Sequence, residues 1–336
     1  MKIKKLLSIF FAVAMGASTF AQANLLNSKT PDEIGKKSAA QLISDNDKPL
    51  PYGYVHDRDV LMGKTIWEFI DLDERINFPL YYPIDTSFVG KERRSLFDIL
   101  VKNIKSGKVT EVYTDDYFNV KRTFKDMNSS FRFEEVVGPG VDYINDNQPN
   151  IYNQLKAFRE KEFNKENKTN DKFVMPIPED LKDIDYIPVL DPQYVNSQEL
   201  SAGDISGYRI KGYWYFDKRQ GELKYRLIGL CPVAPVASEK GKDNAEAIDL
   251  FWVYFPTVRD ILHESKAFND KNSAMPITFD HLLNSRRFNG QIYKEENVYG
   301  DREIQQYMKE NSQNQLLESE RVKEKIRSFE SDMWNY

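Results

Sequence analysis

The segment from Tyr213 to Pro235, which reads YWYFDKRQGELKYRLIGLCPVAP, constrains the fold of this chain more than any other. Aromatic residues lead into a polar turn at residues 217–221, and Leu223, Tyr225 and Leu227 alternate along the returning segment. Alternation with a period of two on both sides of a polar turn is typical of a β-hairpin. We therefore predict a hairpin whose second strand continues into a buried, apolar strand.

The second strand holds Cys231, the only cysteine of the chain, between Leu230 and Pro232. A single cysteine cannot form an internal disulfide, so packing alone must stabilise the fold. We predict that Cys231 is a buried, small hydrophobic residue. A catalytic thiolate is the alternative, but no histidine lies near it in the sequence to activate it.

The first residues have the layout of a cleaved secretory signal. Three lysines precede an apolar run at residues 6–15, and small residues follow up to Ala21 and Ala23. The run is too short to span a membrane, so we predict cleavage after Ala23, with Ala21 as the rival site and an uncleaved anchor as the alternative. Cleavage would remove three lysines and no acid, which moves the formal net charge from -5 to -8. No cysteine lies at the cleavage zone, so we expect no lipid there.

The chain mixes predicted strands and helices without strict alternation, which indicates an α+β fold with a mixed or antiparallel sheet and flanking helices. Prolines interrupt the polar segment that follows the signal and recur between Met175 and Gln193. We read the first as an extended arm and the second as a soft boundary. The predicted parts are the signal peptide 1–23, the N-terminal arm 24–54, an N-terminal subdomain 55–172, a C-terminal α+β subdomain 173–300 and a long amphipathic C-terminal helix 301–336.

Several elements follow from local pattern. Apolar residues at helical spacing predict a helix over residues 93–107. The run Leu250–Phe255 is apolar on both faces, which predicts a central strand. Thr257 and Thr278 are each expected to cap a helix that follows.

The sequence contains few candidates for reactive groups. His56, His263 and His281 have no metal-ligand spacing, and the chain has no glycine-rich phosphate loop and no GxSxG motif. The acidic balance disfavours nucleic-acid binding. The run His56–Asp59 is read as a solvated turn. We therefore expect no cofactor, no metal site and no enzyme activity, and a binding or structural role.

Two stretches, residues 208–235 and 250–307, resemble the gliding-motility protein GldN, called PorN in non-gliding relatives, of the type IX secretion machinery of Bacteroidetes. The resemblance extends over nearly all of the chain that follows the signal. It rests on the motif residues Trp214, Phe216, Asp217, Arg226, Gly229, Pro232, Phe251, Trp252, Phe255, Pro256, Arg259, Arg286, Arg287, Phe288 and the run 293–295.

The resemblance implies a scaffold subunit of the periplasm that is needed for protein secretion and gliding. It would assemble into a ring with an outer-membrane lipoprotein of the GldK/PorK type, which would be its link to the membrane. It would also contact the periplasmic region of a GldM/PorM-type motor protein. Two alternatives stay open: a periplasmic hydrolase that uses carboxylates, and a module that binds cargo peptides.

Overall fold

The computed structural model describes most of the chain after residue 47. The predicted signal peptide with its cleavage after Ala23, the arm up to residue 47 and the predicted boundary at residue 172 lie outside the described residues. The described residues are 48–87, 89–90, 93–123, 127, 130–137, 139, 193, 195–242, 245–268, 277–309 and 311–334.

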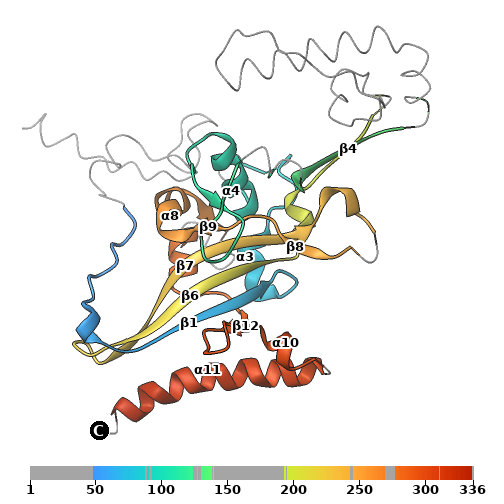
Figure 1. Ribbon diagram of the computed structural model, residues 1–336. Helices are drawn as coiled ribbons and strands as arrows, with labels where there is room; N and C mark the ends of the chain where they lie inside the picture. Colours follow the sequence, from blue (N-terminus) through green and yellow to red (C-terminus); the bar gives the residue numbers. More distant parts are fainter. Residues whose placement is uncertain are drawn as a thin grey trace, which may run out of the picture. The chain divides into compact units, whose positions relative to one another are not determined.

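An antiparallel sheet forms the centre of the fold and confirms the α+β class. Figure 1 shows its three longest strands, β1, β6 and β7, side by side, with α11 along one side of them and α8 along the other. The strand order is β12-β1-β6-β7-β8, and β9 also pairs with β7. The strands are β1 (Val60–Asp71), β6 (Gly207–Asp217), β7 (Glu222–Pro235), β8 (Ala247–Asp249), β9 (Val253–Tyr254) and β12 (Gln291–Glu295).

The predicted hairpin is confirmed as β6 and β7. Its strands pair from Gly207 opposite Val233 to Asp217 opposite Glu222, and Gly221 has a positive φ of 64° in the turn. β1 pairs with β6 along its whole length, and β12 pairs with the other edge of β1. Residues more than 200 positions apart in the sequence thus become direct neighbours.

The helices follow local signals. Ser95 caps α4 by accepting a hydrogen bond from the Asp98 N–H, and Thr278 caps α9 in the same way from the His281 N–H. Gly107, just after α4, has a φ of 73° that favours glycine. The α-helices are α3 (Phe78–Tyr81), α4 (Leu96–Lys105), α8 (Phe255–Glu264), α9 (Phe279–Asn284), α10 (Ile304–Tyr307) and α11 (Ser312–Trp334).

Two local predictions need correction. The strand predicted over Leu250–Phe255 is reduced to the two residues of β9, and α8 begins at Phe255 instead of after Thr257. Pro256 explains the early start, because its fixed φ suits the first helical turn, where its missing N–H costs nothing. The predicted C-terminal helix, with an expected break near residues 311–314, consists of α10 and α11, and its break lies between Tyr307 and Ser312.

The described residues belong to two compact units. The first comprises the described residues up to 122, those of 205–233 and those from 249 onward; the second comprises the described residues of 123–204 and of 234–248. In the second unit β4 (Arg132–Val136) pairs with β5 (Val195–Glu199), and Lys240 forms an ion pair of 2.8 Å with Asp204. The short strands of the first unit are β2 (Val112–Tyr113), β3 (Lys121–Arg122), β10 (Lys266–Ala267) and β11 (Ile277–Thr278).

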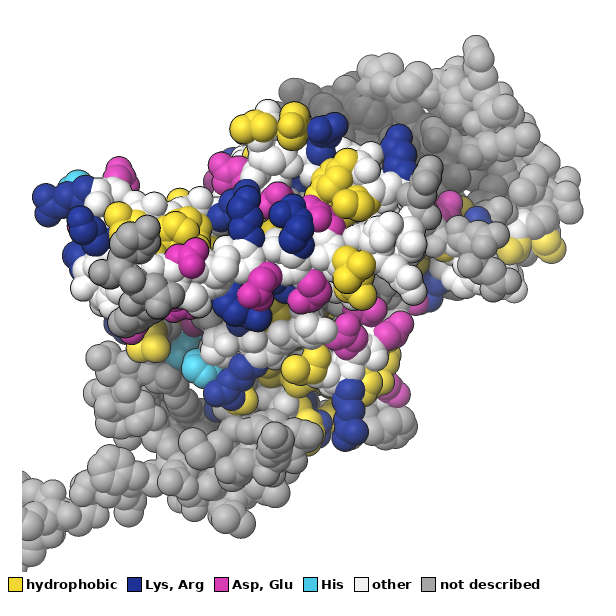
Figure 2. Space-filling view, turned by 90° about the horizontal axis from the view of Figure 1, so that it is seen from below, with side chains coloured by type: hydrophobic (Ala, Val, Ile, Leu, Met, Phe, Trp, Pro, Cys, Tyr) yellow, Lys and Arg dark blue, Asp and Glu magenta, His cyan; other side chains and the backbone are white. Residues whose placement is uncertain are grey.

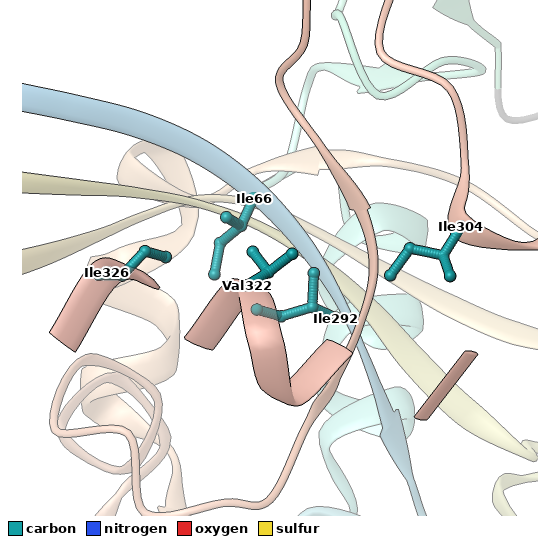
Figure 3. Packing of buried hydrophobic residues seen from close by; sticks show 5 residues of the cluster. All are labelled: Ile66, Ile292, Ile304, Val322 and Ile326. Atoms are coloured by element: carbon teal, nitrogen blue, oxygen red, sulfur yellow. The ribbon is translucent and has the colours of Figure 1, made fainter. Parts of the chain in front are cut away.

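Alternate side chains of β1 point to opposite faces of the sheet, and each face packs against its own buried cluster. Ile66 belongs to a buried aliphatic cluster that also contains Val322 and Ile326 of α11 (Figure 3). Trp67, the next residue, belongs to an aromatic cluster with Cys231. Cys231 is fully buried, as predicted, and burial raises the pKa of its thiol. The aliphatic cluster consists of Ile66, Ile292, Ile304, Val322 and Ile326, and the aromatic one of Trp67, Tyr113, Cys231 and Trp252.

Candidate functional site

An ion pair between a partly buried arginine and a buried carboxylate forms the centre of the first of three polar clusters. Glu68 of β1 is 1% exposed, and its two carboxylate oxygens accept hydrogen bonds of 2.7 and 2.8 Å from Nη1 and Nη2 of Arg286. Arg286 follows α9 and has a φ of 51°, an uncommon conformation for a residue with a side chain. We call Glu68, Trp214, Tyr225, Arg286 and Phe288 the Arg286 cluster.

Aromatic rings surround this guanidinium. Its Cζ lies 4.4 Å from the ring centroid of Tyr225, 5.1 Å from that of Trp214 and 5.2 Å from that of Phe288. Cation–π attraction therefore adds to the ion pair. Burial is the largest single influence on the pKa of Arg286 and lowers it, but the hydrogen bonds and the charge of Glu68, together with Tyr225, outweigh burial and raise this pKa.

A glycine makes room for the Tyr225 ring. A Cβ at Gly212 of β6 would lie 2.2 Å from atoms of that ring, so any side chain there would displace it. Beside the cluster, a cavity of about 340 Å³ lies between the sheet and α11. Its lining includes Trp214, Ile326 and Glu330.

The second cluster holds the end of the N-terminal arm. Two guanidinium groups lie close to the ring of Tyr52, with Arg259 Cζ 4.1 Å and Arg226 Cζ 4.6 Å from its centroid. The Tyr52 hydroxyl donates a 2.8 Å hydrogen bond to Asn284 Oδ1, and burial raises the pKa of Tyr52. We call the surface formed by Arg219, Arg226, Arg259, Asp280 and Asn284 the arm groove.

The same arginines bind the backbone of the arm. Carbonyl oxygens of the arm accept hydrogen bonds from Arg259 Nη2 at 2.7 Å, from Arg226 Nη2 at 3.0 Å and from Arg219 Nη2 at 3.0 Å. The accepting carbonyls belong, in the same order, to Leu50, Gly53 and Tyr54. The arm is thus held as an extended peptide would be, through its main chain and one anchoring side chain.

A second buried ion pair supports the arm groove. Arg259 Nε and Nη2 donate to the two carboxylate oxygens of Asp280 at 2.8 and 3.1 Å. Arg259 is 9% exposed and Asp280 is 4% exposed. Because Asn284 also donates to Asp280 Oδ1 at 2.8 Å, the carboxylate is well satisfied and the pair holds α8 against α9.

The third cluster is a pair of lysines beside Trp67. Lys294 donates to Asp116 Oδ2 at 2.7 Å, and Lys211 donates to the Asp116 main-chain oxygen at 3.0 Å. Their Nζ atoms lie 4.2 and 4.9 Å from the Trp67 ring, and 4.8 and 4.3 Å from that of Tyr117. Burial lowers the pKa of Lys211.

The chain was compared with known protein families. The profile of the gliding motility associated protein GldN matches residues 55–335. This chain belongs to the GldN family. No curated protein matches it. GldN-family membership makes the chain a component of gliding motility and type IX secretion, and the family is not a known family of enzymes.

Five of the GldN-like motif residues lie in the first two clusters. Trp214, Arg286 and Phe288 meet in the Arg286 cluster, and Arg226 and Arg259 meet in the arm groove. The sequence pattern therefore selects residues from β6, β7, α8 and the segment after α9 that the fold brings together in two places.

The other GldN-like motif residues serve the sheet and its edges. Phe216 packs on Phe329 of α11, with ring centroids 5.9 Å apart, and Trp252 belongs to the aromatic cluster. A Cβ at Gly229 would lie 2.7 Å from the Phe118 ring, so this position requires glycine. The rest comprise the buried Asp217 at the turn, Pro232 in β7, the buried Phe251, the buried Phe255 and Pro256 in the first turn of α8, the exposed Arg287, and the run 293–295 of β12, whose Lys294 belongs to the third cluster.

Residues outside the quoted motifs complete each cluster. The GldN-like motif residues include the arginines but not their partners Glu68, Tyr52 and Asp280. Glu68 carried a usable signal, because a charged residue inside the apolar run IWEFID must be paired if it is buried.

The described residues include no group of three or more His, Cys, Asp or Glu side chains that could hold a metal ion. Within the same residues, no helix has the length and apolarity needed to cross a membrane.

Proposed function

We propose that this chain is a non-enzymatic scaffold subunit of the periplasm that assembles, with an outer-membrane lipoprotein of the GldK/PorK type, into the ring of the type IX secretion system. The GldN-family match carries this proposal. The proposed partners also include further copies of the chain and the periplasmic region of a GldM/PorM-type motor protein. Contact with the membrane would pass through the lipoprotein.

The chemistry of the clusters supports a rigid scaffold. The motif arginines bind groups of their own chain: Arg286 binds Glu68, Arg259 binds Asp280, and Arg226 binds a carbonyl of the arm. A hydrolase that uses paired carboxylates needs both near one substrate bond, whereas Glu68 and Asp280 are each bound to a different arginine. These residues therefore fix the shape of the subunit.

The surface along α11 also suits a protein partner. Glu320 pairs with Lys323 at 3.0 Å and Glu324 with Arg327 at 3.1 Å. Figure 2 shows acidic and basic side chains interspersed with hydrophobic ones over one face of the molecule. A surface of mixed charge with exposed apolar residues, such as Leu316 and Leu317, is more typical of protein contacts than of nucleic-acid binding.

An in-frame deletion of the gene tests the proposed role in cells. We expect the deletion to abolish both surface export of type IX cargo and any gliding, because a ring without one subunit type cannot close. Restoring the wild-type chain, or the Arg287→Ala chain with its exposed substitution, should restore export. Normal export of cargo in the deletion strain would contradict the proposed function.

A further inference from the structure

The arm groove recognises residues 48–55 as it would recognise a separate peptide. These residues belong to no helix or strand. They are bound through the Tyr52 ring and three carbonyl oxygens, all by side chains of the hairpin, α8 and α9. Recognition of this kind depends on the bound sequence and not on which copy of the chain supplies it.

A short exposed connector joins the arm to the sheet. Asp59 is fixed to the hairpin turn, because its carbonyl accepts a 2.8 Å hydrogen bond from the Lys218 N–H and its carboxylate lies 3.2 Å from Arg219 Nε. Between Tyr54 and Asp59, the residues His56, Asp57 and Arg58 are exposed. A connector of four residues spans about 14 Å when extended, so an exchanged arm has to reach a neighbouring groove within that distance.

The arm within its own chain leaves apolar surface uncovered. Leu50 is 77% exposed and Tyr54 is 79% exposed, although both flank the anchored Tyr52. A cavity of about 510 Å³, lined by arm residues and by Tyr215, Lys224 and Tyr225, lies between the arm and the groove. The bound arm thus has room beneath it and a free apolar face above it, both of which a neighbouring subunit could fill.

From these features we infer that, in the assembled ring, residues 48–55 of each copy occupy the arm groove of the next copy. This inference rests on the proposed function. An arm bound in a neighbour's groove makes the same contacts as an arm bound in its own groove. The equilibrium between these two arrangements therefore depends on the connector and on the effective concentration of neighbouring chains. In a ring that concentration is high. The exchange is a head-to-tail contact, the type that closes into a ring when the rotation between subunits permits.

Photo-crosslinking with isotope labelling tests the exchange. One full chain, of natural (light) isotope composition, carries the photo-crosslinking probe p-benzoylphenylalanine in place of Tyr52. A second full chain is labelled with heavy isotopes and lacks the probe. The two chains are mixed before they assemble with the lipoprotein. We expect the light probe to become linked to heavy peptides of α8 or α9 in the assembly, and only to light peptides in the isolated chain. The Arg226→Ala variant, made in the heavy copy, should reduce these mixed adducts several-fold.

The length of the connector gives a second readout that needs no probe. Four inserted Gly and Ser residues after His56 should favour closure within one chain and weaken assembly, whereas the same insertion after Gly241, in an exposed turn of the second unit, should not. Two results together would contradict the exchange but not the proposed function: an intact ring that yields adducts only to light peptides, and normal assembly of the variant with the connector insertion. Adducts to the lipoprotein or to cargo would also overturn it. If the wild-type chain and the lipoprotein failed to assemble at all, both the exchange and the proposed function would be contradicted.

Discussion

Replacing Arg286 by leucine is expected to lower the free energy of unfolding by about 3–5 kcal/mol, because it leaves the buried Glu68 carboxylate without a partner. Chemical denaturation of the purified full chain measures this loss. The neighbouring substitution Arg287→Leu is the matched control, since Arg287 is exposed, and it should change stability by less than about 0.5 kcal/mol.

A double variant separates loss of the ion pair from loss of packing. Changing Glu68 and Arg286 together to methionine removes both charges, so no unpaired carboxylate stays buried. We expect this double variant to be more stable than Arg286→Leu alone, since apolar residues of similar volume often replace a buried pair at little cost. Equal destabilisation of Arg286→Leu and Arg287→Leu would show that the Glu68–Arg286 pair does not stabilise the fold.

The second large effect is expected for Arg259→Met. This change leaves Asp280 buried with one partner fewer and removes both a cation–π contact and a hydrogen bond from the arm. We expect a loss of about 3–5 kcal/mol in unfolding free energy, together with faster proteolysis at residues 48–58. The two consequences can be measured separately, by denaturation and by limited digestion.

Tyr52→Ala is the matched control for the arm. It removes the anchoring ring but keeps the Arg259–Asp280 pair, so we expect faster proteolysis of the arm with a loss of only about 1–2 kcal/mol. An arm that is digested at the wild-type rate in both variants would contradict the role of the arm groove.

Local signals predicted local structure well. Three predictions depend on residues that lie close together in the sequence: the hairpin, the helix α4 and the cap at Thr278. The hairpin and the cap are confirmed, and α4 lies within the predicted range 93–107. The strand expected over Leu250–Phe255 was wrong because apolar composition alone does not distinguish a short strand from a buried helix start.

The polar clusters could not be derived from local pattern. Glu68 meets Arg286, and Tyr52 meets Asn284, only because β1 is inserted between β6 and β12 and because the arm returns to the hairpin. Such pairings join residues more than 200 positions apart. The arginines could be named from the family resemblance, whereas their partners required the fold.

The proposed function requires that this chain assembles with other chains. The most direct test is the mass of the complex obtained when the full chain is expressed and exported together with its lipoprotein partner, then purified and measured by light scattering and electron microscopy. We expect a large, closed ring in which the two proteins occur at a fixed ratio. A lone monomer that leaves the lipoprotein unbound would contradict it.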